Sequence, residues 1–404
     1  MKNTFCFILL IVLPVSAQEL RLEKIAVYGN RRTRSSAIIR ELCLKPEERL
    51  TESVLKRERQ WLIRLDNWKK VEFQLKPADG AGRDLVVVVE ERANWGIYPL
   101  LSNDYRFGWR GGFRLLRRNL WGLRHEAEAA MEIGGIEQFT LDYRIPWWAK
   151  RWRLFSRLSF RKTAFLYQYP DVEGPFPFRE TAFFVVTGKQ IGRCLRIGTA
   201  AGVAEAETAP DPSGPAGPER FIRWEGFVEL DTRDWPRYPR SGVYGRFWHL
   251  RMESDSNPFQ KTGMEARLYT SLFHRNTLAV HAWAERAHQP LPLTQRLRLG
   301  GGDSIRGYHL GDLSGDSGSF FSTEYRIPIA FEGNPLTGIH AGYSVVLFMD
   351  TGSVWPANQA LSKTRWVWAA GSGLHFLWDK WLFRLEYGRR HHGGFINVAT
   401  GVKF

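Results

Sequence analysis

The 404-residue sequence has little cysteine and no long hydrophobic run beyond its first residues. Of its 3 cysteines, only Cys43 and Cys194 lie outside the apolar N-terminal segment. Two cysteines are too few for a disulfide framework, so we expect two free thiols, with a single bridge as the alternative. No later apolar stretch approaches the roughly 20 residues that a transmembrane helix needs. These absences exclude a disulfide-stabilised small domain and a helical membrane protein.

The N-terminal segment is typical of a secretory signal peptide. Lys2 gives a positive start, an apolar run extends from Phe5 to Leu13, and small residues precede Gln18. The apolar run is too short to span a bilayer, and segments of this kind are removed on export. We therefore expect cleavage after residues 1–17 and an exported protein.

Aromatic residues and positive charge are abundant. Aromatics form 14% of the chain, with 17 tryptophans, and the formal net charge is +15. Export argues against nucleic acid as the partner of this charge, so we expect basic side chains to face outer-membrane lipids, including lipopolysaccharide, or to lie on solvated loops. An exported, aromatic-rich chain without long apolar runs is typical of an outer-membrane β-barrel.

Residues 18–92 predict a small α+β domain with the order β-α-α-β-β. Apolar residues at helical spacing, and then at alternate positions, give each element one buried face. Capping residues precede both helices. The predicted elements are a strand at 25–28, a helix capped by Thr33 or Ser35, a helix capped by Thr51, and strands at 71–75 and 85–89.

Residues 93–404 predict a transmembrane barrel of sixteen antiparallel strands. Segments of about ten residues alternate between apolar and polar and are separated by turn residues. An even number of strands is what a closed bacterial barrel requires. The predicted strands cover residues 93–101, 107–116, 125–134, 137–146, 152–162, 179–190, 194–205, 221–232, 242–252, 261–273, 277–287, 318–329, 342–353, 366–378, 381–389 and 397–404.

The lengths of the connections support this count. Most connections after odd-numbered strands are long, and many after even-numbered strands are short, as expected if the N-terminus is periplasmic. The sixth connection after an odd-numbered strand, expected to face outside, spans residues 288–317. It contains the glycine-rich stretch Gly300 to Tyr308, with one arginine, Arg306. An arginine in such a loop is ordinarily a solvated cation unless acidic residues converge on it.

Several motifs resemble the BamA/TamA superfamily of outer-membrane assembly and translocation proteins (the bacterial surface antigen family). Residues 22–92 resemble a POTRA domain, beginning with the pattern Ile25-x-Val27-x-Gly29-Asn30. Residues 118–122 (RNLWG) and the stretch from Asp231 to Gly242 resemble turns of that family. In the sixth connection, Ile305-Arg306-Gly307-Tyr308 matches its arginine motif. The chain is thus similar to a short member with a single POTRA domain.

The resemblance implies a position for the sixth loop and a function. It implies that residues 288–317 fold into the barrel lumen and that Arg306 is held by Glu324 and Asp350, on the twelfth and thirteenth strands. It implies insertion of proteins into the outer membrane or their translocation across it. Unfolded client polypeptides are then expected to bind the POTRA domain, while accessory proteins stay unspecified. The alternative is a closed structural or channel barrel without assembly activity.

Further residues are expected at the barrel seam and the C-terminus. A gate between the first and last strands is implied by the resemblance. Pro99 lacks an N–H and is tolerated best in a weakly paired strand, and Gly393 and Gly394, before the last strand, add freedom. The chain ends in an alternating segment with Val402 and Phe404, which resembles the C-terminal signal of barrel proteins.

Two short strings resemble hydrolase motifs but are expected to be turns. They are Gly302-Asp303-Ser304 and Gly315-Asp316-Ser317-Gly318. A serine nucleophile needs a positioned base and an oxyanion hole, and neither string is accompanied by a histidine motif. The sequence also lacks a Cys/His metal cluster and a phosphate-binding loop. We therefore expect a non-catalytic protein without a cofactor.

Overall fold

The computed structural model describes most of the chain between residues 21 and 401. The signal peptide at 1–17 lies outside the described residues, and so do Val402 and Phe404. The described ranges are 21–45, 47–78, 82–104, 106–148, 152–168, 175–208, 218–254, 257–273, 275–332, 341–359, 361, 364–378, 381–391 and 393–401.

The N-terminal domain has the predicted order β-α-α-β-β. Its sheet has the order β1-β3-β2, with β1 parallel and β2 antiparallel to β3. Ile38, Leu62 and Leu85 are fully buried in the core between the helices and the sheet. The elements are β1 (Leu22–Tyr28), α1 (Ser35–Ile39), α2 (Glu52–Arg64), β2 (Trp68–Pro77) and β3 (Arg83–Glu91).

The helix caps were predicted correctly for α2 and wrongly for α1. Thr51 precedes α2, and its side chain accepts a hydrogen bond from Val54 N, as a capping threonine does. Helix α1 has no side-chain cap. The Thr33 hydroxyl instead donates to Glu91 Oε1 at 2.6 Å, and Ser35 is already the first helical residue.

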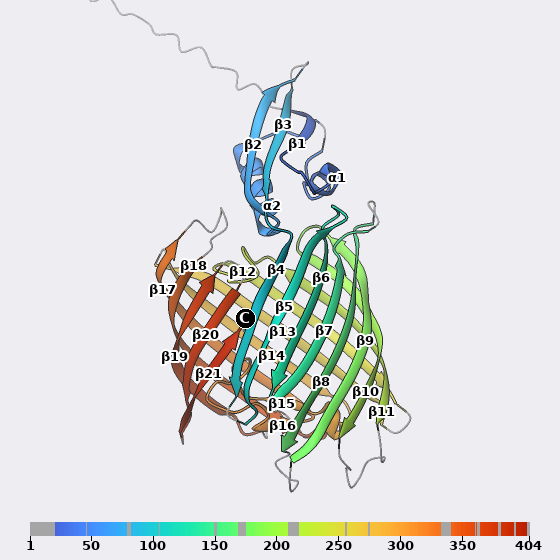
Figure 1. The fold of residues 1–404 in the computed structure, drawn as a ribbon, viewed down its shortest axis with the longest axis vertical. Helices are drawn as coiled ribbons and strands as arrows, with labels where there is room; N and C mark the ends of the chain where they lie inside the picture. Colours follow the sequence, from blue (N-terminus) through green and yellow to red (C-terminus); the bar gives the residue numbers. More distant parts are fainter. Residues whose placement is uncertain are drawn as a thin grey trace, which may run out of the picture.

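The rest of the chain forms a closed barrel of sixteen antiparallel strands, as predicted. The N-terminal domain stands over one end of the barrel, called here the domain end, and the opposite end is called the far end (Figure 1). The strands are β4 (Trp95–Asp104), β5 (Gly108–Leu120), β6 (His125–Gly134), β7 (Ile136–Ile145), β8 (Leu154–Gln168), β9 (Pro175–Ile191), β10 (Leu195–Thr208), β11 (Glu219–Asp231), β12 (Gly242–Glu253), β13 (Phe259–Leu272), β14 (Asn276–Ala287), β17 (Ser317–Glu332), β18 (Ala341–Trp355), β19 (Val367–Trp378), β20 (Trp381–Arg389) and β21 (Gly394–Thr400).

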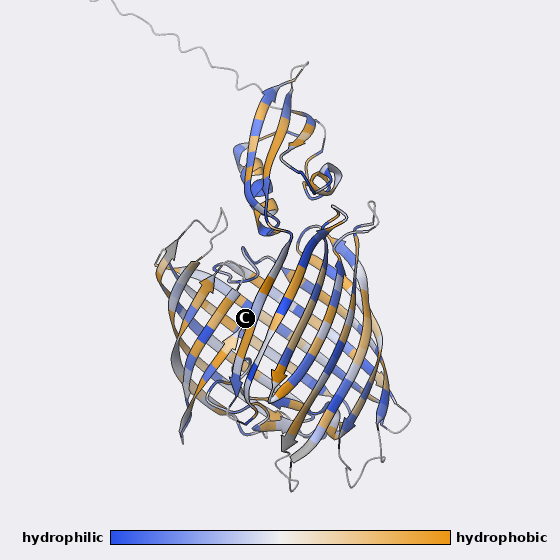
Figure 2. Cartoon of the chain, in the orientation of Figure 1, coloured by the Kyte–Doolittle hydropathy of each residue, from blue (hydrophilic) through white to orange (hydrophobic). Residues whose placement is uncertain are grey.

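Apolar and polar residues alternate along the strands of the barrel (Figure 2). In β11, Ile222 and Trp224 are exposed on the outside, whereas Glu225 is buried on the inside. This period of two places apolar side chains against lipid and polar ones toward the lumen. Within the described residues, no helix is long and apolar enough to cross a bilayer.

Among the described residues, the barrel closes through its least extensive strand pair. Strands β21 and β4 share one residue pair in the described part of the chain, Val398 with Asn103. The neighbouring pair β20–β21 is in register from Phe383 and Thr400 to Arg389 and Gly394. Each lost pair removes ladder hydrogen bonds. Within the described residues, the seam between β4 and β21 is therefore held by fewer backbone contacts than the β20–β21 pair.

The sixth connection packs against the barrel wall instead of extending away from it. It contains the 3-10 helix η1 (Leu293–Gln295) and a two-stranded sheet of β15 (Leu297–Leu299) and β16 (Leu313–Gly315). Leu299 and Ile305 pack with Phe320 and Ala369, which are inward-facing residues of the wall. This apolar contact fixes the position of the arginine that follows Ile305.

Candidate functional site

The backbone of the sixth connection folds tightly around Arg306. Gly300 and Gly307 have φ angles of +121° and +89°, which L side chains rarely adopt. A Cβ at Gly307 would lie 3.1 Å from the carbonyl carbon of Gly388 in β20, and a Cβ at Gly388 would lie 2.5 Å from Gly307 N. Glycines at both positions let the loop backbone approach the wall closely.

Arg306 is completely buried, and the wall satisfies its whole guanidinium. Its Nε and Nη2 donate to Asp350 Oδ2 and Oδ1, both at 2.8 Å. Its Nη1 donates to Glu324 Oε1 at 2.7 Å and to Glu386 Oε1 at 2.8 Å. Nη2 also donates to Ser322 Oγ at 3.1 Å. All five N–H donors of the guanidinium therefore have acceptors, and four of the five contacts are to carboxylates.

The structure brings Arg306, Glu324 and Asp350 together, and it adds a partner that sequence reasoning missed. Glu386 lies on β20 and is 0% exposed. Alternation in β20 places Arg384 and Glu386 on the inner face, so the inward position could be predicted. The contact between Glu386 and Arg306 could not be predicted, because it depends on how far the sixth connection reaches across the barrel.

The charges around Arg306 balance. Besides Arg306, two buried arginines contact the same acids: Arg326 Nη2 lies 2.8 Å from Glu324 Oε2, and Arg384 Nη1 lies 3.5 Å from Glu386 Oε2. Three guanidinium groups thus meet three carboxylates within the cluster. A buried charge is tolerated only when it is paired in this way.

The same cluster contains a set of metal-type ligands, three of whose four carboxylate oxygens already accept hydrogen bonds from arginines. Glu324, His375 and Glu386 offer ligand atoms within 4.8 Å of one another. Glu386 Oε1 accepts from Arg306 and lies 3.0 Å from His375 Nε2. A cation bound here would have to displace a guanidinium, which would leave that arginine buried without its partner. The donor set therefore fits an ion-pair network better than a metal centre.

The residues predicted at the seam are not brought together. Asn103 is the residue of β4 that pairs with β21 in the described part of the chain, and Pro99 lies four residues before it in β4. Gly394 lies toward the far end, and the prediction that it precedes the last strand is wrong: it pairs with Arg389 as the first residue of β21. Gly393 makes the turn, with φ of +93° and its carbonyl accepting from Arg390 N at 2.9 Å.

The two hydrolase-like strings contribute to loop structure. Ser317 Oγ accepts from Ala287 N at 3.0 Å, and Asp316 Oδ1 accepts from Leu291 N at 3.1 Å. Ser304 Oγ accepts a hydrogen bond from Gly300 N and donates one to Gly300 O, both at 2.7 Å. Both serine hydroxyls are engaged with backbone groups of the same connection or its neighbouring strand, which favours the turn interpretation.

Two turns with family-like motifs lie against the N-terminal domain. In the turn after β5, Asn119 Nδ2 donates to Thr33 Oγ1 at 2.8 Å, and Gly122 O accepts from Arg34 N at 3.0 Å. Gly122 has φ of +69°, and a Cβ there would lie 2.5 Å from Arg32 O. Glycine is needed because the domain backbone passes so close.

Ion pairs extend this junction across three turns of the domain end: those after β5, β9 and β11. The acidic members on the domain include Glu58, which is 0% exposed on α2 although it carries a charge. The two free thiols belong to the parts that meet here: Cys43 lies in the N-terminal domain and Cys194 in the turn after β9. The cross-junction pairs are Glu41 with Arg124, Glu58 with Arg193, Asp66 with Arg237 and Asp231 with Arg64.

Residues 221–390 match the model of the Omp85 superfamily domain. This part of the barrel is an Omp85 superfamily domain. The matched residues include Arg306 and its three carboxylate partners, so the ion-pair cluster lies inside the Omp85 domain. The resemblance to the BamA/TamA superfamily is thereby confirmed, and the protein is an outer-membrane β-barrel. A search of curated protein sequences gave no match.

Solved structures of Omp85-type proteins share this fold. BamA from Haemophilus ducreyi lacking POTRA domains 1–3 aligns over 94% of this chain and 83% of its own, with 14% identity and a TM-score of 0.61. CdiB from Escherichia coli aligns over 95% of this chain and 76% of its own, with 13% identity and a TM-score of 0.66. CdiB from Acinetobacter baumannii aligns over 95% of this chain and 74% of its own, with 14% identity and a TM-score of 0.64. At these identities the likeness concerns the fold.

Proposed function

We propose that this Omp85 barrel inserts client proteins into the bacterial outer membrane or moves them across it, without catalysis. The observation that carries the proposal is the combination of an Omp85 domain with a seam of one described residue pair. A closed barrel with equally strong pairs throughout has no place for lateral opening. A weak pair lets a client strand enter by replacing lost ladder hydrogen bonds.

The N-terminal domain is proposed to be a periplasmic POTRA domain that receives the client. Strand β2 forms one edge of its sheet, with β3 as its paired neighbour, and its last six residues are all partly or fully exposed. An extended peptide can add to such an edge through backbone hydrogen bonds. The domain stands over the end of the barrel at which β4 begins and β21 ends, so it can deliver a client to the seam (Figure 1).

The cluster around Arg306 is proposed to act as a brace. It ties the sixth connection to β17, β18 and β20, and β20 pairs directly with β21. A rigid wall on this side of the seam confines opening to the β4–β21 contact. Arg306, with Ile305, Gly307 and Tyr308, therefore has a structural role in the proposed mechanism and does not contact the client.

A disulfide across the seam tests the proposal. Asn103→Cys and Val398→Cys place thiols on directly paired strands, where Cα atoms lie about 4.5–5.5 Å apart, within disulfide range. Both changes are made with Cys43 and Cys194 replaced by serine. The oxidised protein should lose its acceleration of the folding of a test barrel protein in vesicles, and reductant should restore it.

The matched control is a disulfide at a seam that stays closed. Ile197→Cys and Val228→Cys link β10 to β11, which pair along their whole length. This control should keep full activity. If both disulfides leave client folding unchanged, lateral opening at β4–β21 is wrong.

A channel is the second candidate function, because part of the lumen is open. A cavity of about 650 Å³ lies between the inner faces of β6 to β12, and its lining includes Arg157, Arg161 and Arg223. Single-channel recording in planar bilayers distinguishes the two functions. Steady, anion-selective conductance together with no effect on client folding would favour the channel.

A further inference from the structure

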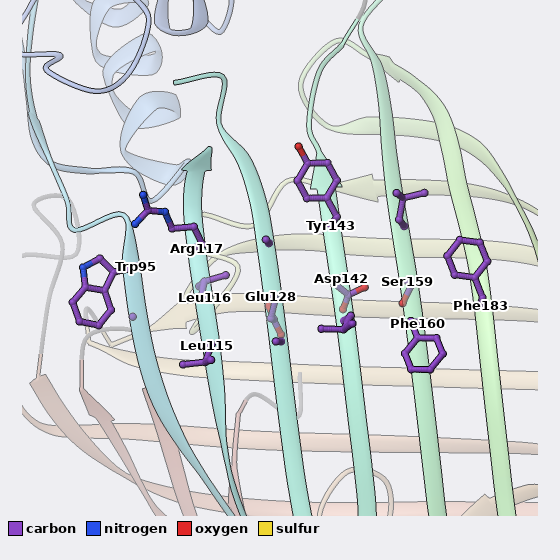
Figure 3. Close-up of a pocket in the computed structure, with 15 residues that line it drawn as sticks. Trp95, Leu115, Leu116, Arg117, Glu128, Asp142, Tyr143, Ser159, Phe160 and Phe183 are labelled. Atoms are coloured by element: carbon purple, nitrogen blue, oxygen red, sulfur yellow. The ribbon is translucent and has the colours of Figure 1, made fainter. Parts of the chain in front are cut away.

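The outer wall of the barrel carries a hollow of about 560 Å³ across β4 to β9 (Figure 3). This volume falls within the range of small-molecule sites, roughly 300–1,000 Å³. Leu115, Leu141, Phe160 and Phe183 are among the residues that line it, so its walls are mainly apolar. The hollow faces away from the lumen, because Leu115, Leu141 and Phe183 are exposed on the outside of the barrel.

Strand register explains why the wall is hollow here. Two adjacent outward rows cross β5 to β7. One reads Arg117, Ala127 and Tyr143, and the other reads Leu115, Ala129 and Leu141. In each row an alanine of β6 stands between two larger side chains. The trough along β6 is therefore walled by bulky neighbours on both sides.

The trough is polar at one end. Arg117 lies three residues before the end of β5 and pairs with Trp95, the first residue of β4, so both mark the domain end. In Figure 3, Arg117 and Trp95 lie near each other at one end of the hollow, and Phe160 and Phe183 lie farther along the wall. Tyr143 completes this row and bonds His125 Nδ1 at 2.8 Å through its hydroxyl. The hollow thus changes from aromatic and cationic to apolar along its length.

The charge of Arg117 has no acidic partner among the described residues. Its guanidinium is exposed and meets Asn94 Oδ1 at 3.4 Å. By contrast, Arg114 on the inner face of the same strand lies 3.2 Å from Glu128. An arginine on the lipid face costs most at the bilayer midplane and little near the interfaces. Arg117, at the domain end of the wall and without an acidic partner there, is therefore available to pair with the phosphate of a lipid headgroup.

A second hollow, of about 600 Å³, meets the first at Trp95 and is also cationic. It lies between the N-terminal domain and the start of β4. Four basic and two acidic side chains line it: Arg31, Arg32, Lys69 and Arg92, with Glu90 and Glu91. The apolar trough therefore leads into a region of net positive charge at the level where lipid headgroups lie.

We propose that the trough binds one anionic glycerophospholipid. An acyl chain lies over Ala127 and Ala129, and the phosphate lies at Arg117, with the headgroup toward Arg31 and Arg32. A guanidinium binds phosphate oxygens through paired, charge-assisted hydrogen bonds. The assignment to the periplasmic leaflet rests on the proposed orientation of the domain end. The bound lipid links the N-terminal domain to β4 and β5, the strands beside the seam.

Lipid binding to the purified full-length protein in detergent tests this proposal. Native mass spectrometry measures the fraction that retains phosphatidylglycerol or phosphatidylethanolamine during titration. Arg117→Gln should weaken phosphatidylglycerol binding about tenfold and abolish the preference over phosphatidylethanolamine. Ala129→Phe fills the trough and should abolish binding of both. Unheated gels verify that each variant forms a folded barrel.

Two controls match these changes elsewhere on the outer wall. Lys189→Gln removes an outward cation near the domain end, where Lys189 stands 5.6 Å from the Trp152 ring. Ala266→Phe adds an outward ring on β13, outside the trough. Both should bind phosphatidylglycerol as the unmodified protein does.

Three outcomes would overturn the proposal. The first is equal phosphatidylglycerol retention by Arg117→Gln, Ala129→Phe and the unmodified protein. The second is an equal loss in the controls. The third is tighter, Arg117-dependent binding of lipopolysaccharide, which would assign the trough to the other leaflet. Because this measurement contains no client, its failure is independent of the proposed insertion activity.

Discussion

Two clusters of arginine–carboxylate contacts join distant parts of this chain, and they differ in their access to water. In the loop cluster, Arg306 and its acidic partners are all 0% exposed. In the junction cluster between the N-terminal domain and the barrel, Glu58 is 0% exposed, but Arg193 is 14% exposed and Arg237 is 32% exposed. The same residue types thus form a sealed network in one place and a partly hydrated one in the other.

This difference predicts which of the two clusters stays intact as long as the barrel is folded. One guanidinium serves three carboxylates in the loop cluster, so its loss would leave like charges facing each other without solvent. In the junction cluster each carboxylate meets two or three arginines, several of them partly exposed, so a second arginine or water can replace a lost contact. We therefore expect the loop to stay seated whenever the barrel is folded, and the domain to separate when charges are screened.

Arg306→Ala should have the largest effect. It leaves Glu324, Asp350 and Glu386 buried without their shared cation, which costs about 3–5 kcal/mol. The folded barrel should unfold at a lower temperature on unheated gels, and the sixth loop should become protease-sensitive. Arg296→Ala in the same connection is the control, because Arg296 is 37% exposed and lies 3.7 Å from Asp316. If Arg306→Ala behaves like this control, Arg306 is a solvated loop cation.

Glu386→Gln should come next and tests the partner that the sequence did not reveal. The amide keeps the shape but removes one charge between Arg306 and Arg384, which costs about 2–3 kcal/mol. Its midpoint temperature should fall by less than that of Arg306→Ala. Glu229→Gln is the control, since Glu229 meets Arg196 at 3.3 Å in a more hydrated part of the lumen. Equal midpoints for Glu386→Gln and Glu229→Gln would contradict the sealed network.

Glu58→Gln should have a smaller effect, confined to the junction. It weakens the contact with Arg193 and keeps the side chain that accepts from Cys43 N at 3.0 Å. We expect a loss of about 1–2 kcal/mol in domain docking and an unchanged barrel midpoint. Limited proteolysis near residues 92–94 should become faster and should accelerate with added salt. Glu72→Gln on the exposed face of β2 is the control, and equal cleavage rates in the two variants would refute the assignment.

The smallest effect concerns pH. His309 in the sixth connection lies against Phe395, with ring centroids 3.7 Å apart. Burial lowers the pKa of His309 below its ordinary value near 6.5, although Asp312 and Asp104 oppose this shift. The neutral form is therefore favoured in the folded protein. Its stabilising contribution is present above pH 6.5 and is lost as pH falls through the lower, folded-state pKa.

Proteolysis of the sixth loop measures this pH effect. Cleavage should increase by no more than about threefold between pH 7.5 and pH 5, and His309→Gln should remove that dependence. A pH dependence that persists in His309→Gln would assign it to another group.

The strands were predictable because their environment has two sides. Lipid outside and a polar lumen inside impose a period of two on every strand, which is why all sixteen were found. Helix α1 was harder, because Thr33 is used by Glu91 and not as a cap. Gly394 was misplaced because its pairing with Arg389 depends on the turn at Gly393. Such choices depend on contacts that sequence spacing does not contain.

By itself the sequence determined the strand count, the small N-terminal α+β domain and the family resemblance, because each follows from local periodicity or a short motif. Tertiary structure decided three things: that Glu386 joins Arg306, that acidic residues of the domain meet arginines of the turns, and that Ala127 and Ala129 form a trough. These depend on strand register and on how far a loop or domain reaches. Neither quantity is local, since both are set by the closure of the whole barrel.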